Sequence, residues 1–241
     1  MTFSLSEMSD LGSDLCSEFQ AAEPWPHVVI DNFLPEHLAQ NTLASFPDPD
    51  HDVWFDWTKK GGDNQFKKQG IGNASRLEKA SPYIQHVLAA FQSYPFLKFL
   101  ENLTQIPKLL PDPYMFGGGL HQILRGGHLK VHADFNELTR LDLYRRINVL
   151  YYLNENWKAE YNGELELWDA QSKSCVKSVA PFFNRLVVFV TDKQSLHGHP
   201  KTLNTPEGMT RKSLAFYYYT ALPAEGTKYD VKTDWYPTEH S

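Results

Sequence analysis

The chain has 241 residues, a formal net charge of −6 and only two cysteines, Cys16 and Cys175. Its length and 41% hydrophobic content fit one globular domain with a sizeable core, and it contains no basic run that would indicate a nucleic-acid surface. The cysteines provide no disulfide framework, the acidic N-terminus lacks the pattern of a secretory signal, and no apolar run approaches the roughly 20 residues that cross a bilayer. We therefore expect a single domain over residues 1–241, located in the cytoplasm, with no membrane partner.

Helical patterns dominate the first 110 residues. Apolar residues recur at helical spacing in three stretches, which are 1–22, 36–45 and, with an interruption around Pro95, 77–106. Residues 27–30 are predicted to form a strand. Residues 50–75 are polar and predicted to form an irregular, mobile loop. Its lysine pairs, at 59–60 and 67–68, could meet an anionic substrate, but we favour a solvated surface for each. We interpret residues 1–110 as a mostly helical support.

Short β-type runs replace the helical patterns after residue 114. They are separated by Gly, Asn, Asp and Pro turns and cover residues 120–124, 130–135, 147–153, 164–168, 185–190 and 213–219. Many short strands without intervening helices predict a sandwich, a barrel or a jelly roll. The expected fold class is therefore mainly β with α, with a core over residues 111–222 and a surface tail over residues 223–241.

A pair of metal-binding residue types, His132 and Asp134, lies two positions apart in the run 130–135. On a strand both side chains point to one face. A third ligand is expected from His197 or His199, which follow the run 185–190. Two histidines and one carboxylate are the facial triad of non-haem Fe(II) oxygenases. We prefer His197 because it lies nearer the strand end, and His199 is the alternative ligand or a supporting loop residue. His121 and His128 are weaker ligand candidates. Without this context, His-x-Asp would indicate an ordinary surface or turn histidine.

A candidate carboxylate site lies on the last predicted strand. Arg211 and Ser213 share one face there, and a guanidinium can bind a carboxylate bidentately while a neighbouring hydroxyl adds a hydrogen bond. Tyr152 offers a phenol from the run 147–153. An isolated Arg211 would indicate a surface salt bridge, but the metal residues favour the anion site. Residues on the same two strand faces are expected to line this pocket, and they are Asn148, Leu150 and Tyr217.

The order and spacing of these motifs resemble the prolyl 4-hydroxylase-type branch of the 2-oxoglutarate/Fe(II)-dependent oxygenases, which includes the hypoxia-sensing prolyl hydroxylases. The segments that carry the resemblance are 132–134, 145–157, 163–167, 184–189, 196–197 and 211–219. It implies a double-stranded β-helix, a jelly-roll core supported by N-terminal helices. It further implies that Fe(II) is bound by His132, Asp134 and His197. The distal carboxylate of 2-oxoglutarate would be bound by Arg211 and Tyr152, with Ser213 beside them.

The resemblance implies a dioxygenase that couples the oxidative decarboxylation of 2-oxoglutarate to hydroxylation of a C–H bond, with ascorbate as a reductant. A prolyl residue of a protein or peptide is the most familiar target of the family, and a free amino acid or another small molecule is the other class of substrate. Two alternatives compete with this interpretation: a jelly-roll binding module without catalysis, and a cupin-like metalloenzyme that does not use 2-oxoglutarate. An intact Arg211 beside three metal ligands argues against both.

Overall fold

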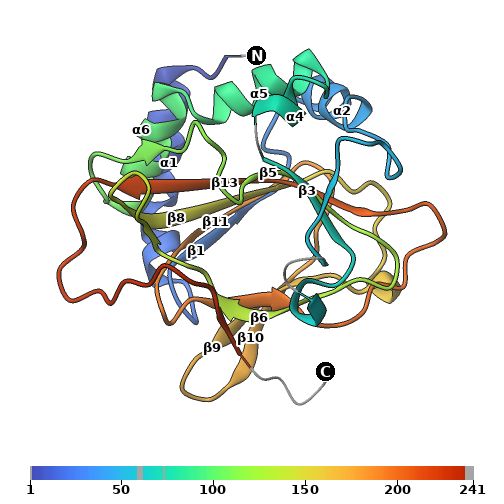
Figure 1. The fold of residues 1–241 in the computed structure, drawn as a ribbon. Helices are drawn as coiled ribbons and strands as arrows, with labels where there is room; N and C mark the ends of the chain where they lie inside the picture. Colours follow the sequence, from blue (N-terminus) through green and yellow to red (C-terminus); the bar gives the residue numbers. More distant parts are fainter. Residues whose placement is uncertain (1, 59–61, 73, 237–241) are drawn as a thin grey trace.

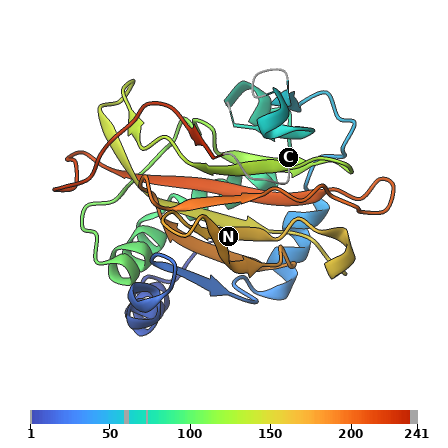
Figure 2. The same ribbon diagram turned by 90° about the horizontal axis from the view of Figure 1, so that it is seen from below.

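The computed structural model describes residues 2–58, 62–72 and 74–236. Two antiparallel sheets face each other, and the helices cover the outer face of the larger sheet (Figure 1). In Figure 2, which views the molecule from below, the smaller sheet is nearer the reader. This architecture confirms the predicted fold class, a mainly β chain with a jelly-roll core supported by N-terminal helices.

The helices form where apolar periodicity and capping residues coincide. They are α1 (Leu5–Ala21), α2 (Glu36–Ala44), α4 (Ala74–Leu77), α5 (Pro82–Phe91) and α6 (Tyr94–Thr104), with 3-10 turns η1 (Gly62–Gln65) and η2 (Ala159–Tyr161). The hydroxyls of Ser4 and Ser81 accept hydrogen bonds from backbone N–H groups in the first turns of α1 and α5. The predicted interruption near Pro95 is confirmed, because α5 ends at Phe91 and Pro95 lies in the first turn of α6.

The larger sheet carries most of the predicted strands. Its strands occur in the order β1 (His27–Ile30), β11 (Arg185–Val190), β8 (Leu143–Tyr152), β13 (Arg211–Thr220), β5 (Gly119–Ile123), β3 (Lys68–Ile71) and β2 (Phe55–Asp56). Two short strands lie off this path: β4 (Leu110–Pro111) pairs with β13, and β7 (Glu137–Leu138) pairs with β8. The smaller sheet has the order β10 (Ser174–Val179), β9 (Leu165–Asp169), β12 (Leu196–His199), β6 (Leu129–Ala133) and β14 (Asp234–Trp235).

Alternation along β8 shows how the two faces of the larger sheet are used. Ile147, Val149 and Tyr151 join the main hydrophobic core with residues of α1, α5 and α6. The residues between them, Asn148, Leu150 and Tyr152, point to the opposite face. Tyr152 packs there with Leu165 and Leu167 of the smaller sheet. The space between the two sheets therefore receives polar side chains from both of them.

Four parts of the chain depart from the sequence-based predictions. Residues 50–75 are not an irregular loop throughout, because β2 and β3 extend the larger sheet through the pairing of β3 with β5; the lysine pair at 59–60 lies outside the described residues. Residues 196–199 form the strand β12, whereas His197 and His199 were expected to follow a strand. The expected surface tail over 223–241 contains β14, which pairs with β6. The strand β10 was also not predicted.

Candidate metal and carboxylate site

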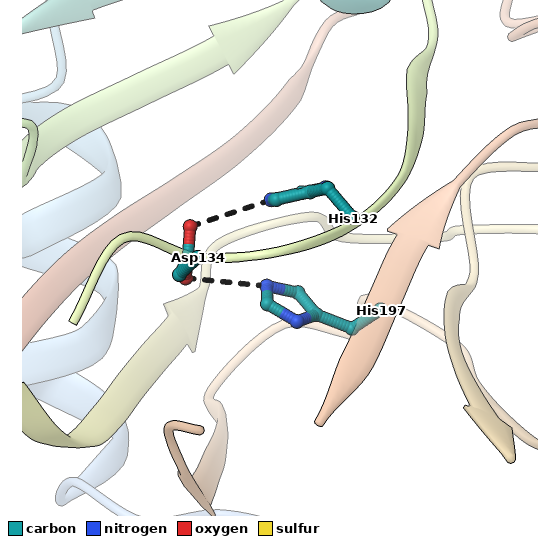
Figure 3. Close-up of side chains that lie close together, drawn as sticks. All are labelled: His132, Asp134 and His197. Carbon is teal, nitrogen blue, oxygen red and sulfur yellow. Dashed lines mark ion pairs between the residues drawn. The ribbon is translucent and has the colours of Figure 1, made fainter. Parts of the chain in front are cut away.

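The pairing of β6 with β12 brings the predicted metal ligands together. His197 is directly opposite His132, and Asp134 follows the last residue of β6. Nε2 of His132 lies 3.4 Å from Oδ1 of Asp134, and Nε2 of His197 lies 3.4 Å from Oδ2 (Figure 3). One potential ligand atom from each residue lies within 4.8 Å of the other two. Two imidazole nitrogens and a carboxylate oxygen therefore converge on one point, as a facial triad requires.

Backbone carbonyl groups orient both imidazole rings. Nδ1 of His132 lies 2.8 Å from the carbonyl oxygen of Lys130, and Nδ1 of His197 lies 2.9 Å from that of Ser195. A proton on Nδ1 satisfies each carbonyl and leaves the lone pair of Nε2 directed at the other ligands. Burial, reinforced by the neighbouring His197, lowers the pKa of His132. The neutral imidazole that results is the form that binds a metal ion.

A buried arginine fixes the carboxylate of Asp134. Arg145 is 0% exposed, and its Nη2 donates to Oδ2 of Asp134 at 2.8 Å. Nδ2 of Asn148 donates to the same oxygen at 2.7 Å, while Oδ1 of Asn148 accepts from Nε of Arg145 at 2.7 Å. Burial alone would raise the pKa of Asp134, but Arg145 and the two histidines outweigh it and hold this pKa well below the usual range. The carboxylate is therefore ionised, and Oδ1 is its oxygen free for a metal ion.

The predicted carboxylate site lies beside the metal ligands, in a cavity of about 70 Å³. Arg211 is buried, its Nε donates to the carbonyl oxygen of Gly163 at 2.6 Å, and its Nη2 donates to the hydroxyl of Tyr152 at 3.0 Å. Because that hydroxyl accepts from Arg211, its own proton is available to an anion. Ser213 is directly opposite Tyr152 in the pairing of β13 with β8. The three residues lie together, as predicted.

The predicted pocket residues lie around the same cavity. Leu150 and Asn148 line it from β8, and Tyr217 lines it from β13. The ring of Tyr217 lies under the guanidinium of Arg145, with 3.4 Å between ring centroid and Cζ. Asn148 therefore supports the metal ligand Asp134, while Leu150 contributes an apolar wall.

His199, the alternative third ligand, is not in the cluster formed by His132, Asp134 and His197. It is 2% exposed, and its pairing places it opposite Leu129, beyond an irregularity in the strand. Both of its ring nitrogens lack a hydrogen-bond partner among the described residues. Burial, reinforced by Arg211, holds its pKa well below the usual value, so the ring is neutral. It lines the cavity that contains Arg211.

Three residues with no role predicted from the sequence, and His121, which was only a weaker ligand candidate, also contact the site or line it. Lys68 of β3 and His121 of β5 line the cavity, and Arg145 holds Asp134. The ring of Trp235 lies 4.9 Å from that of His132, because β14 pairs with β6. His121 is not in the cluster of metal ligands found among the described residues. Lys68 and Trp235 occupy short polar segments that give no strand signal of their own.

The family match lies in the part of the chain that contains the candidate site. Residues 118–219 match the family model described as the 2OG-Fe(II) oxygenase superfamily. Prolyl hydroxylase EGLN3 of Mus musculus is 34% identical over 77 residues, which are 32% of this chain and 30% of that protein. Prolyl 3-hydroxylase OGFOD1 of Mus musculus is 34% identical over 79 residues, or 31% of this chain and 14% of that protein. The chain thus covers less than a third of the length of either relative.

Similarity to solved structures extends over nearly the whole chain. A prolyl hydroxylase of Trichoplax adhaerens, solved with a hypoxia-inducible-factor peptide, covers 89% of this chain and 91% of its own at 17% identity, with a TM-score of 0.56. A prolyl-4-hydroxylase of Pseudomonas putida covers 87% and 99% at 19% identity, with a TM-score of 0.54. HygX of Streptomyces hygroscopicus, solved with nickel, 2-oxoglutarate and hygromycin B, covers 86% of each chain at 12% identity, with a TM-score of 0.52. These matches confirm the fold, and the family model over residues 118–219 confirms the predicted resemblance to the 2OG-Fe(II) oxygenase superfamily. None of the described helices is both long and apolar enough to span a membrane.

Proposed function

We propose that this chain, which resembles the 2-oxoglutarate/Fe(II)-dependent oxygenases, is a dioxygenase that hydroxylates a C–H bond. One observation carries the proposal: the metal-ligand cluster lines the same small cavity between the sheets as Arg211, whose guanidinium donates to the Tyr152 hydroxyl, and Ser213. A cupin-like metalloenzyme that does not use 2-oxoglutarate has no need of the carboxylate site. A binding module without catalysis has no need of either group. The combination therefore favours the oxygenase over both alternatives.

Each residue of the site has a defined role in this proposal. His132, Asp134 and His197 hold Fe(II), while Arg211, Tyr152 and Ser213 bind the distal carboxylate of 2-oxoglutarate. When bound, the metal and 2-oxoglutarate supply the oxidising power for hydroxylation with O2, giving succinate and CO2 as co-products. The protein orients the ligands through Arg145 and Asn148. Apolar walls, including Leu150, Leu165 and Phe189, limit water beside the metal.

The proposed substrate is a prolyl residue of a protein or peptide, which the names of the prolyl hydroxylase relatives support. A free amino acid or another small molecule is the alternative, and HygX, solved with hygromycin B, supports it. We further propose that ascorbate acts as a reductant, that residues 1–241 act as one oxygenase domain, and that the protein works in the cytoplasm.

The decisive experiment measures 2-oxoglutarate binding by calorimetry, with Mn(II) in place of Fe(II) so that no turnover occurs. We expect binding that requires the metal ion and is weakened at least tenfold in Arg211→Met, since a bidentate charge-assisted contact is lost. Arg146→Met is the matched control, because Arg146 lies on β8 outside the cavity lining. Succinate release with Fe(II) and ascorbate measures activity. Equal affinity of the wild type and Arg211→Met for 2-oxoglutarate would refute the proposal.

A further inference from the structure

A larger groove opens outward from the metal ligands. Its volume is about 430 Å³, and Lys68, His132, Asp134 and Tyr217 line both this groove and the inner cavity. Arg211 lines the inner cavity but not the groove. A molecule in the groove would therefore lie directly against the metal ligands without occupying the carboxylate site. In an oxygenase this is the place of the substrate, so the groove lining contains information about substrate chemistry.

Seven aromatic residues line the groove. They come from distant segments of the chain and are Phe55, Trp57, Tyr114, Phe116, Phe135, Tyr217 and Trp235. Tyr114 and Phe116 are 54% and 52% exposed, so the aromatic surface continues beyond the groove onto the outside of the protein. Exposed aromatic residues beside a groove are typical of a surface that contacts a partner. The occupant therefore extends past the groove, as a peptide does and a free amino acid does not.

The charge of the groove is opposite to that of the whole chain. Its described lining contains three cationic residues, Lys68, Arg76 and Arg140, and one carboxylate, Asp134. Asp134 is paired with Arg145 and also attracts Lys68, so its single negative charge offsets only part of the positive charge of the groove. The chain as a whole has a net charge of −6. A positive groove on an acidic protein attracts an anionic ligand and disfavours a cationic one.

Of the three cationic residues in the groove lining, Lys68 is the one that also lines the inner cavity. It is directly opposite Ile123 on β5, which is in turn opposite Arg211 on β13, so Lys68 and Arg211 belong to one row across the sheet. The ammonium group of Lys68 has no hydrogen bond or ion pair with any described residue. Desolvation by burial lowers its pKa to about 8. Lys68 is half-buried, so its charge is partly desolvated, and an anion supplied by the substrate would offset that cost.

We propose that the groove binds an acidic peptide, in which an Asp or Glu close to the hydroxylated residue pairs with Lys68 while its neighbours pack on the aromatic wall. This inference rests on the proposed function, from which it takes the hydroxylation reaction. It adds the class of substrate and a residue that selects it. Arg140 lies 4.9 Å from the ring of Tyr114 at the groove and provides a second positive charge for a longer acidic segment.

The test compares rhodamine-labelled peptides of equal length with a central proline flanked by Glu, Gln or Lys. Binding is measured by fluorescence anisotropy with Mn(II) and 2-oxoglutarate present, so no turnover is needed. We expect the Glu peptide to bind at least tenfold more tightly than the Gln peptide, and the Lys peptide to bind most weakly. Lys68→Met should abolish the Glu preference, Lys68→Arg should keep it, and Lys68→Glu should favour the Lys peptide.

Lys67→Met is the matched control, because Lys67 is the exposed neighbour whose ammonium group contacts the carbonyl oxygen of Arg125. The Glu preference should survive in this variant. Equal binding of the three peptides by the wild type, or no binding of any, would overturn the proposal. So would free glutamate competing as well as the unlabelled Glu peptide. A Glu preference that persists in folded Lys68→Met would also overturn it.

The affinity of Lys68→Met for 2-oxoglutarate, measured by calorimetry, separates this inference from the proposed function. Unchanged affinity with loss of the Glu preference supports Lys68 as a substrate residue. A loss of 2-oxoglutarate affinity as large as in Arg211→Met would assign Lys68 to the carboxylate site and refute the inference. Failure of the wild type to bind 2-oxoglutarate would refute the proposed function, while the peptide preference would still be measurable in its own right.

Discussion

Replacement of Arg145 by Met tests whether the buried arginine holds the metal-binding carboxylate. Met keeps most of the aliphatic packing, so the main loss is the charge that faces Asp134 at 2.8 Å. Because Arg145 is 0% exposed, water cannot replace it. Breaking a buried ion pair from one side costs about 3–5 kcal/mol. For a protein of this length, about 2–4 °C of melting temperature is lost per kcal/mol, so we expect a decrease of roughly 6–20 °C without metal.

Metal binding changes the size of this effect. A divalent cation gives Asp134 a new opposite charge, so added Mn(II) should restore part of the lost stability. The affinity for Mn(II) should still fall by about 10–100-fold, because the carboxylate is no longer oriented. Thermal denaturation with and without Mn(II), and calorimetric titration of the metal, measure the two quantities. Arg146→Met is the control for loss of an arginine from the same strand.

The pH dependence of the stability difference follows from the pKa of Asp134. Arg145 contributes to holding that pKa low. A carboxyl group whose pKa is lowered by folding stabilises the fold at pH values above its pKa in the unfolded chain, which is about 3.9. This stabilisation is lost as the pH falls through the pKa that Asp134 has in the folded protein. Arg145→Met removes the lowering of this pKa that Arg145 causes, so the stability deficit should be largest at neutral pH and should shrink as the pH falls below about 4. A deficit independent of pH, or unchanged stability at pH 7, would refute this account of Arg145.

Three further substitutions test separate parts of the structure. Phe91→Ala leaves a cavity at a fully buried position between the helices and the larger sheet. It should lower the free energy of unfolding, measured by urea denaturation, by about 3–5 kcal/mol. A loss below about 1 kcal/mol would contradict the packing described. Tyr152→Phe removes a hydroxyl that contacts Arg211 and should weaken 2-oxoglutarate binding roughly fivefold in calorimetry, whereas equal affinity would exclude the hydroxyl from the site. Trp235→Ala removes the ring beside His132 and should weaken Mn(II) binding several-fold while 2-oxoglutarate affinity at saturating metal stays unchanged; unaltered metal affinity would show that the ring does not position the histidine.

Two pairs of candidate site residues could be predicted from the sequence because each pair lies close together along the chain. His132 with Asp134, and Arg211 with Ser213, each lie two positions apart, so the two-residue period of a strand places each pair on one face. The apolar alternation of β8 likewise separates its core face from its pocket face. These local patterns predicted a β-rich core and the pairs of site residues, whereas the jelly roll and the full set of site residues were implied by the family resemblance.

The periodicity of a strand could not decide whether His197 or His199 is the third metal ligand. Both lie on β12 two positions apart, so strand periodicity alone gives them the same direction. Their difference comes from pairing: His197 is opposite His132, whereas His199 is opposite Leu129 after an irregularity. Pairing is a tertiary property that one strand does not encode. The same reason explains why Lys68 was missed, since β3 becomes part of the site only by pairing with β5.

The strand β14 has a consequence for how the protein can be handled. Its two residues complete the smaller sheet next to β6, which carries His132. If the segment 234–236 were pulled away, β6 would become an edge strand with unpaired N–H and C=O groups, a template for pairing with another chain. A cut or a bulky fusion near residue 234 would thus remove the Trp235 ring from the metal site and promote aggregation at the same time. An affinity tag is better attached before α1, on the helical side away from the smaller sheet (Figure 1).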